Sequence, residues 1–181
     1  AADIRDELMF TGGVPGAGVY SSWTLGVSAI GSNLDSGIVA EAKRELNAWP
    51  AILDRPLEDT VIAKAIPDSL RLMAYDEPAL AALDVSTALP GLDLAGYHLA
   101  GWHDLFCEGN LRAYAELSSR GRQRLVVGPW AHSTMLNRLT GELDFGVDAA
   151  GDFNGVMDEQ VGFLTAAVAG DDVPTGARLF V

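Results

Sequence analysis

Two short apolar segments, each ending at an ionisable side chain, constrain the fold of this chain more than any other feature. The first spans residues 97–104 and ends at Asp104, and the second spans residues 124–132 and ends at His132. Between them, apolar residues recur at helical spacing and predict an amphipathic helix over 108–120. A strand, a helix and a second strand in this order are typical of a parallel sheet. We therefore predict an α/β fold in which both ionisable residues reach the same edge of one sheet.

The flanking sequence predicts a helical region before this unit and one more helix after it. Residues 1–37 are rich in glycine and small residues, which indicates a loop followed by a short apolar helix. Asp35 or Ser36 can cap a helix over about 37–49. Prolines divide the following stretch into short helices, which we expect over 59–65, 67–75 and about 76–83. The first half of the chain shows no strand alternation, and a last helix is expected over 154–169.

Composition excludes several classes of protein. With 49% hydrophobic residues among 181, the chain can bury a core and is not globally disordered. Its 25 acidic and 12 basic residues leave a net charge of −13, which repels nucleic-acid phosphates and anionic lipid, so we expect neither nucleic acid nor a membrane as a partner. No apolar run approaches the ~20 residues of a membrane-spanning helix. The chain shows no signal peptide, and its single cysteine, Cys107, fits a reducing compartment, so we expect a cytoplasmic location.

Asp104 and His132 are the residues from which we expect chemistry. An aspartate that accepts the Nδ1–H of an imidazole holds one tautomer and stabilises the imidazolium that forms when the ring takes a nucleophile's proton. The order of acid before histidine is that of α/β-hydrolases, in which the serine comes first. An alternative without chemistry stays open. In it Asp104 caps the helix that begins near Phe106, and His132 is a loop residue.

The residues that most suggest a metal site are His98, His103 and Asp104. Alternation along a strand places His98 and Asp104 on one face and His103 on the other, so the three side chains should not converge on a metal ion. We expect neither a metal nor a cofactor. His98 is interpreted as a core or edge histidine, and Cys107 as a packing thiol.

Two motifs of this chain resemble those of a known family. Residues 101–106 read Gly-Trp-His-Asp-Leu-Phe, and residues 125–133 read Leu-Val-Val-Gly-Pro-Trp-Ala-His-Ser. They resemble the acid and histidine motifs of the X-Pro dipeptidyl-peptidase (S15) serine hydrolases, in particular of the cocaine-esterase-like branch. That branch writes them Gly-Trp-Tyr-Asp-x-Phe and Leu-x-x-Gly-Pro-Trp-x-His, so His103 stands here in place of a tyrosine. The resemblance is sharp over 84–146 and weaker over 1–50.

The resemblance implies a serine hydrolase of the acyl esterase or X-Pro dipeptidyl-peptidase type, which cleaves ester or amide bonds of a small substrate. It makes Asp104 the triad acid and His132 the triad base. It places Phe106 in the acyl pocket and Trp23 on a first cap helix, facing the substrate. For Trp23 an alternative stays open, a buried aromatic that anchors its helix.

The fold that the resemblance implies is a partial α/β-hydrolase fold, namely the C-terminal half of the parallel sheet with an α-helical cap. Residues 1–90 would form the cap region and residues 91–176 the half-domain. Residues 177–181 would start a following β domain of the jelly-roll type.

The nucleophile is the part of the triad that the chain does not clearly supply. The only candidate is Ser28, within Gly-Val-Ser-Ala-Ile-Gly at residues 26–31, and the residues before it make a poor core strand. The nucleophile is therefore either Ser28 or, as the poor strand favours, a serine upstream of residue 1. In the second case the partner is the remainder of the hydrolase domain, or another copy of the chain. The alternative function is a non-catalytic fragment or interaction module that needs a partner chain.

Overall fold

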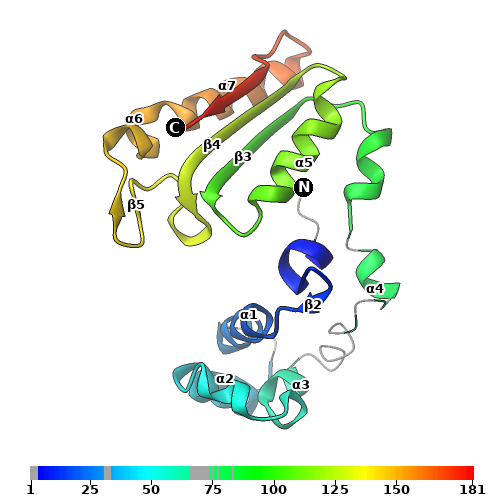
Figure 1. Cartoon of the computed structure of the whole chain (residues 1–181), viewed down its shortest axis with the longest axis vertical. Coiled ribbons are helices and arrows are strands. Elements are labelled where there is room, and N and C mark those ends of the chain that lie inside the picture. The colour runs from blue at the N-terminus through cyan, green and yellow to red at the C-terminus, as the bar shows by residue number, and fades with distance from the viewer. Residues whose placement is uncertain (1–3, 31–33, 66–73, 75, 77, 83) are drawn as a thin grey trace. The chain divides into compact units, whose positions relative to one another are not determined.

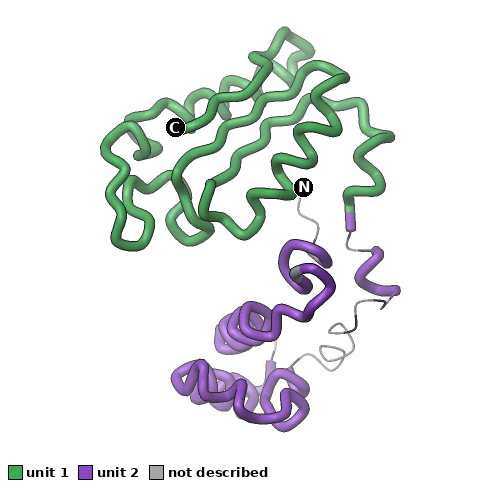
Figure 2. The backbone as a smooth tube through the Cα atoms, in the orientation of Figure 1, with its two compact units in different colours: residues 1–3, 85–181 green, residues 4–84 purple. Residues whose placement is uncertain are grey.

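The structure, a computed structural model, describes residues 4–30, 34–65, 74, 76, 78–82 and 84–181. The chain forms two compact units, which Figure 2 shows in different colours. Residues 4–84 make up the first, here called the helical unit, and residues 85–181 the second, here called the sheet unit. Each unit is described by itself.

The helical unit consists of short helices and one small hairpin. Its elements are a π-helix Ile4–Met9, strands β1 (Phe10–Thr11) and β2 (Val14–Pro15), helices α1 (Ala17–Ile30) and α2 (Ser36–Asn47), 3-10 turns Ala51–Asp54 and Leu57–Asp59, and helices α3 (Val61–Ala65) and α4 (Pro78–Ala81). The antiparallel β1–β2 pair corrects the prediction that the first half of the chain is helical throughout. Gly12 and Gly13 make its turn with positive φ angles of 59° and 81°. Two residues per strand are too few for alternation to be visible in a sequence.

One apolar cluster forms the core of the helical unit. Its buried members come from the hairpin, the helices and one 3-10 turn, and they are Met9, Phe10, Tyr20, Leu25, Ala29, Ala42, Ile52, Val61, Ile62 and Leu80. The prediction of a cap before α2 is confirmed, because Asp35 Oδ1 accepts a hydrogen bond of 2.8 Å from the backbone N–H of Gly37. The helix expected over 67–75 lies almost wholly outside the described residues.

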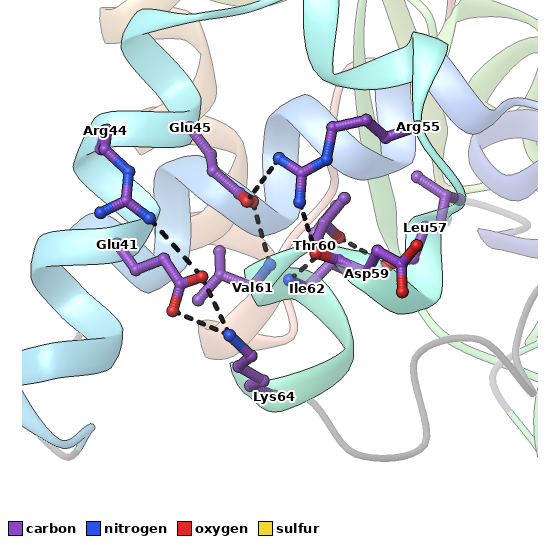
Figure 3. A network of polar contacts seen from close by, with 10 residues as sticks. All are labelled: Glu41, Arg44, Glu45, Arg55, Leu57, Asp59, Thr60, Val61, Ile62 and Lys64. Carbon is purple, nitrogen blue, oxygen red and sulfur yellow. Dashed lines mark hydrogen bonds and ion pairs between the residues drawn. The ribbon is translucent and has the colours of Figure 1, made fainter.

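A polar network joins α2 to the short helix α3 (Figure 3). The carboxylate of Glu45, which is 4% exposed, accepts hydrogen bonds from Arg55 Nη1 at 3.1 Å and from the backbone N–H of Val61 at 2.9 Å. Lys64 pairs with Glu41 at 2.9 Å, and this hydrogen bond lowers the pKa of the Glu41 carboxyl. Glu45 thus caps the first turn of α3 with a negative charge, which stabilises a helix too short to persist alone.

The sheet unit is built on a three-stranded parallel sheet, of which the sequence predicts the parallel pair of the first two strands but not the third strand (Figure 1). Its strands are β3 (Gly96–His103), β4 (Gln123–Ala131) and β7 (Gly176–Leu179), in the order β3-β4-β7. Helix α5 (Cys107–Ser118) connects β3 to β4. The connection from β4 to β7 contains hairpin β5 (Leu139–Thr140) and β6 (Leu143–Asp144) and helices α6 (Gly151–Asn154) and α7 (Val156–Ala169). Short 3-10 turns occupy Ser86–Gly91, His132–Thr134 and Val147–Ala149. None of the helices within the described ranges is long and apolar enough to cross a membrane.

Helices α5 and α7 cover opposite faces of this sheet (Figure 1). Successive side chains of β4 point to opposite faces of the sheet. Leu125 and Val127 therefore pack with α5, whereas Val126 packs with Val156 at the start of α7. The connections β3–α5–β4 and β4–α7–β7 move across the sheet in the same direction but pass over opposite faces. The two crossovers therefore have opposite handedness. One of them therefore lacks the right-handed sense that nearly all such connections have.

Strand β7 completes the sheet at the C-terminal end of the chain. It pairs in parallel with residues 124–127 of β4, and the backbone N–H of Phe180 donates to the carbonyl oxygen of Val127 at 2.9 Å. Glu159 of α7 binds Arg124 Nε at 2.5 Å and Arg178 Nη1 at 3.2 Å, which ties the helix to both strands. Residues expected to start a following domain thus belong to the same sheet as β3 and β4. A further β domain stays a prediction.

Candidate active site

Asp104 and His132 meet at the edge of the sheet where β3 and β4 end. Each follows the last residue of its strand, and these last residues, His103 and Ala131, are paired in register. Because adjacent parallel strands end at one edge, the two side chains emerge as neighbours. Asp104 Oδ2 lies 3.3 Å from His132 Nδ1. The structure thus brings together the two residues that the sequence singles out.

Two glycines give room below this pair, Gly101 between the strands and Gly128 for the Trp130 ring of its own strand. Gly101 pairs with Gly128, and the register then shifts before His103 pairs with Ala131. A Cβ atom on Gly101 would lie 2.1 Å from the carbonyl oxygen of Trp130, and one on Gly128 would lie 2.4 Å from the Trp130 ring. This irregularity re-aims the residues that follow it, as bulges beside active sites do. Sequence reasoning missed it, although glycine inside a strand is the signal that marks such positions.

Asp104 uses its two carboxylate oxygens for different partners. Its side chain is 5% exposed, and Oδ1 accepts a hydrogen bond of 2.8 Å from the backbone N–H of Phe106, at the start of the α5 turn. Oδ2 faces the imidazole of His132. The bond from Phe106 belongs to the turn before α5, whose N-cap is Phe106 and has no side-chain cap, so the alternative in which Asp104 caps the helix is wrong. The turn bond instead fixes the carboxylate in the orientation that the pairing with His132 needs.

The imidazole ring of His132 is largely exposed. Its side chain is 61% exposed, and the edge-on ring of Phe106 lies against it with centroids 5.4 Å apart. An ionised carboxylate only accepts hydrogen bonds, so Nδ1 must be the nitrogen that carries the hydrogen. Nε2 then has a lone pair, and no group in the described part of the chain bonds to it. The arrangement has the parts of a general base.

Trp23 and Ser28 both lie on α1, in the helical unit. Trp23 is 53% exposed, which contradicts the alternative of a buried anchor, while its predicted role toward a substrate stays a prediction. Ser28 is 2% exposed within the helix. A hydrolase nucleophile needs an exposed turn between a strand and a helix, so Ser28 does not have the geometry of that residue.

The remaining histidines have partners of their own. His98 is 7% exposed, its Nε2 lies 2.9 Å from Gln123 Oε1, and its ring packs edge-on against Tyr114. Burial lowers the pKa of His98, and the hydrogen bond to Gln123 opposes this only in part. The interpretation of His98 as a core histidine is confirmed. His103 is exposed and stacks against Phe145. Across the described residues, no three His, Cys, Asp or Glu side chains are placed to hold a metal ion.

Comparison with known proteins agrees with the two motifs. Residues 1–134 of the 181 match the sequence model of the X-Pro dipeptidyl-peptidase (S15 family), and the matched region includes both Asp104 and His132. A segment of 61 residues is 38% identical to the cocaine esterase of Rhodococcus sp. (strain MB1 Bresler). This segment is 34% of the chain but only 10% of that esterase, so the match spans a small part of the relative's length. Since the family match covers well over half of the sequence, the chain belongs to the X-Pro dipeptidyl-peptidase (S15) family, a family of esterase- and peptidase-type hydrolases.

Proposed function

We propose that this chain supplies the acid and the base of a Ser-Asp-His triad that cleaves an ester or amide bond in a small acyl substrate. The observation that supports this most is the 3.3 Å contact between Asp104 Oδ2 and His132 Nδ1, which leaves Nε2 without a hydrogen-bond partner among the described residues. Membership of a family of hydrolases supports the reaction class.

The proposed steps follow the chemistry of an acyl-enzyme hydrolase. A serine hydroxyl donates to Nε2 of His132, and its oxygen attacks the substrate carbonyl while Nε2 takes the proton. Asp104 stabilises the imidazolium, which then protonates the leaving alcohol or amine as the carbonyl reforms. Water, deprotonated by the same nitrogen, attacks the acyl-serine ester and releases the carboxylic acid, and the serine recovers its proton. Phe106, whose ring packs on His132, is proposed to line the acyl pocket.

We further propose that the serine comes from a longer parent protein, upstream of residue 1. The buried, helical position of Ser28 favours this over a nucleophile within the chain. In that protein the sheet unit would be the C-terminal part of an α/β-hydrolase domain, and the helical unit would be a cap with Trp23 toward the substrate. The position of β3 supports the first assignment, because on its outer side it pairs with no strand among the described residues.

Substitutions in the parent protein test the assignment. We expect His132→Ala to lower kcat/KM for an acyl ester by several orders of magnitude, and Asp104→Ala by about 10⁴-fold, the loss typical of a histidine without its orienting carboxylate. His103→Ala is the matched control, because His103 is an exposed histidine next to Asp104 but packs against Phe145. The double variant of Asp104 and His132 should be no worse than His132→Ala alone. Near-normal hydrolysis by His132→Ala, or an equal loss in His103→Ala, would refute the proposal.

A second candidate function is an interaction module completed by a partner chain. The exposed side of α7 favours it, since four exposed apolar residues follow one another there at intervals of three or four: Met157, Val161, Leu164 and Val168. An apolar stripe of this kind and the outer edge of β3 are both surfaces that proteins cover. Size-exclusion chromatography of the isolated chain tests this function: association that a Val161→Glu change abolishes supports it, and a monomer at all concentrations contradicts it. A monomer that reacts with a fluorophosphonate would instead restore Ser28 as the nucleophile.

A further inference from the structure

Two threonine hydroxyls link backbone groups on either side of Trp130, just before His132. Thr140 Oγ1, in β5, donates to the carbonyl oxygen of Pro129 at 2.8 Å. Thr134 Oγ1 accepts from the backbone N–H of Ala131 at 3.3 Å, and the two hydroxyl oxygens lie 3.4 Å apart. Both threonines are half-buried.

The direction of each hydrogen bond follows from the number of hydrogens available. A hydroxyl carries one hydrogen, and that of Thr140 goes to the carbonyl of Pro129. Thr134 must therefore donate to Thr140, and it accepts from Ala131. The hydroxyl network thus runs one way, from the N–H of Ala131 through Thr134 and Thr140 to the carbonyl of Pro129, and each hydroxyl accepts one bond and donates one.

This network holds the segment from which His132 leaves the strand. Trp130, between its two ends, is 2% exposed, and its Nε1 donates to the carbonyl of Ala149 at 2.7 Å. The β5–β6 hairpin that carries Thr140 has only two residue pairs, braced by Arg138 and Asp144 at 2.7 Å. By contrast, the exposed ring of His132 has one hydrogen-bond partner, Asp104, and one aromatic neighbour, Phe106, among the described residues. Its orientation therefore depends on where the backbone places it.

We propose that Thr140 and Thr134 are positioning residues for His132, through which the β5–β6 hairpin sets the backbone that aims the imidazole at Asp104. This inference rests on the proposed function for its catalytic meaning, although its physical content is a property of the chain itself. Neither hydroxyl forms a hydrogen bond with the ring. Displacement of a catalytic base by about 1 Å is enough to cost about 10²-fold in rate.

The test compares matched variants of the 181-residue chain. Thr140→Val removes the hydroxyl at nearly constant volume, and Thr140→Ser restores it. Thr165→Val is the control, because it removes a similar hydroxyl bond, of 2.8 Å to the carbonyl of Val161, from α7. Amide exchange of Ala131 reports the network, and the ring nitrogens of His132 in long-range ¹H–¹⁵N spectra report the imidazole. The ring signals of the other two histidines serve as internal references.

Thr140→Val removes two of the three hydrogen bonds of the network and leaves the bond of Ala131 to Thr134 unsupported, so we expect Ala131 exchange to speed up about fivefold or more. It should also shift the His132 ring nitrogens away from a single tautomer. Thr140→Ser should restore both signals, Thr165→Val should change neither, and Thr134→Val, at the other end of the network, should reproduce both changes. In the parent enzyme Thr140→Val should lower kcat with KM nearly unchanged.

Unaltered His132 ring signals in folded Thr140→Val or Thr134→Val, or changes that serine does not restore, would overturn the inference. A fully active His132→Ala parent would instead overturn the proposed function, and it would leave these spectra as they are. The two failures are therefore distinguishable.

Discussion

Replacement of Gly101 by alanine should separate β3 from β4 at the base of the candidate site. The new Cβ would lie 2.1 Å from the carbonyl oxygen of Trp130, whereas ordinary contact begins at 3.4 Å, so the backbones must part by about 1.3 Å. The atom that the new Cβ would meet first is a backbone oxygen, so no side chain can rotate away to make room. Overpacking of this kind costs about 1–3 kcal/mol of the free energy of unfolding. Even an added 1 Å would take the 3.3 Å contact of Asp104 and His132 beyond hydrogen-bonding distance.

Urea denaturation and the ring-nitrogen spectra of His132 measure the two consequences separately. Gly162→Ala is the matched control, because Gly162 lies within α7 and a Cβ there would meet nothing within 4 Å. The control should gain about 0.5–1 kcal/mol, the usual preference for alanine over glycine in a helix. Replacement of glycine by alanine should thus lower the free energy of unfolding at position 101 and raise it at position 162. A Gly101→Ala chain as stable as the wild type, with unchanged His132 signals, would refute the reasoning.

Two further predictions concern charges in the sheet unit. Burial lowers the pKa of His98, so the unfolded chain binds the proton more tightly than the folded chain does. The free energy of unfolding should therefore be highest above about pH 6.5 and fall as the pH drops toward the lowered folded pKa. In urea titrations His98→Gln should lose this slope, and an unchanged slope would contradict the assignment. Glu159→Gln removes the charge that binds two arginines of β4 and β7 and should cost about 1.5–3 kcal/mol by urea denaturation. Its control, Glu108→Gln, breaks an exposed helix pair and should cost about 0.5 kcal/mol or less, so equal losses would contradict the prediction.

The parts of the fold with a regular pattern were predictable from sequence. Strands β3 and β4 are short apolar runs bounded by turn residues, and α5 and α7 show apolar residues at helical spacing. The meeting of Asp104 and His132 followed from one topological rule, that neighbouring parallel strands end at the same edge of a sheet. This rule needs only the order of the elements, and a single sequence supplies that order.

Features that depend on pairings distant in the chain were not predictable. The pairing of β7 with β4 joins residues about fifty positions apart, and no local pattern specifies it. Strands β1, β2, β5 and β6 have two residues each, too few for alternation to register. The hydroxyl network joins Thr140 to Pro129 only because the β5–β6 hairpin folds back on β4. Threonine is too common in loops to have marked that role in advance.

The tautomer of His132 in the isolated chain tests the central claim most directly. The claim is that an ionised Asp104 holds the imidazole with its hydrogen on Nδ1, so that Nε2 is free to act as a base. At a pH where the ring is neutral, we predict ¹⁵N shifts of a protonated Nδ1 and an unprotonated Nε2, and the loss of this pattern in Asp104→Ala. A mixture of tautomers in the wild type, unchanged by Asp104→Ala, would contradict the account.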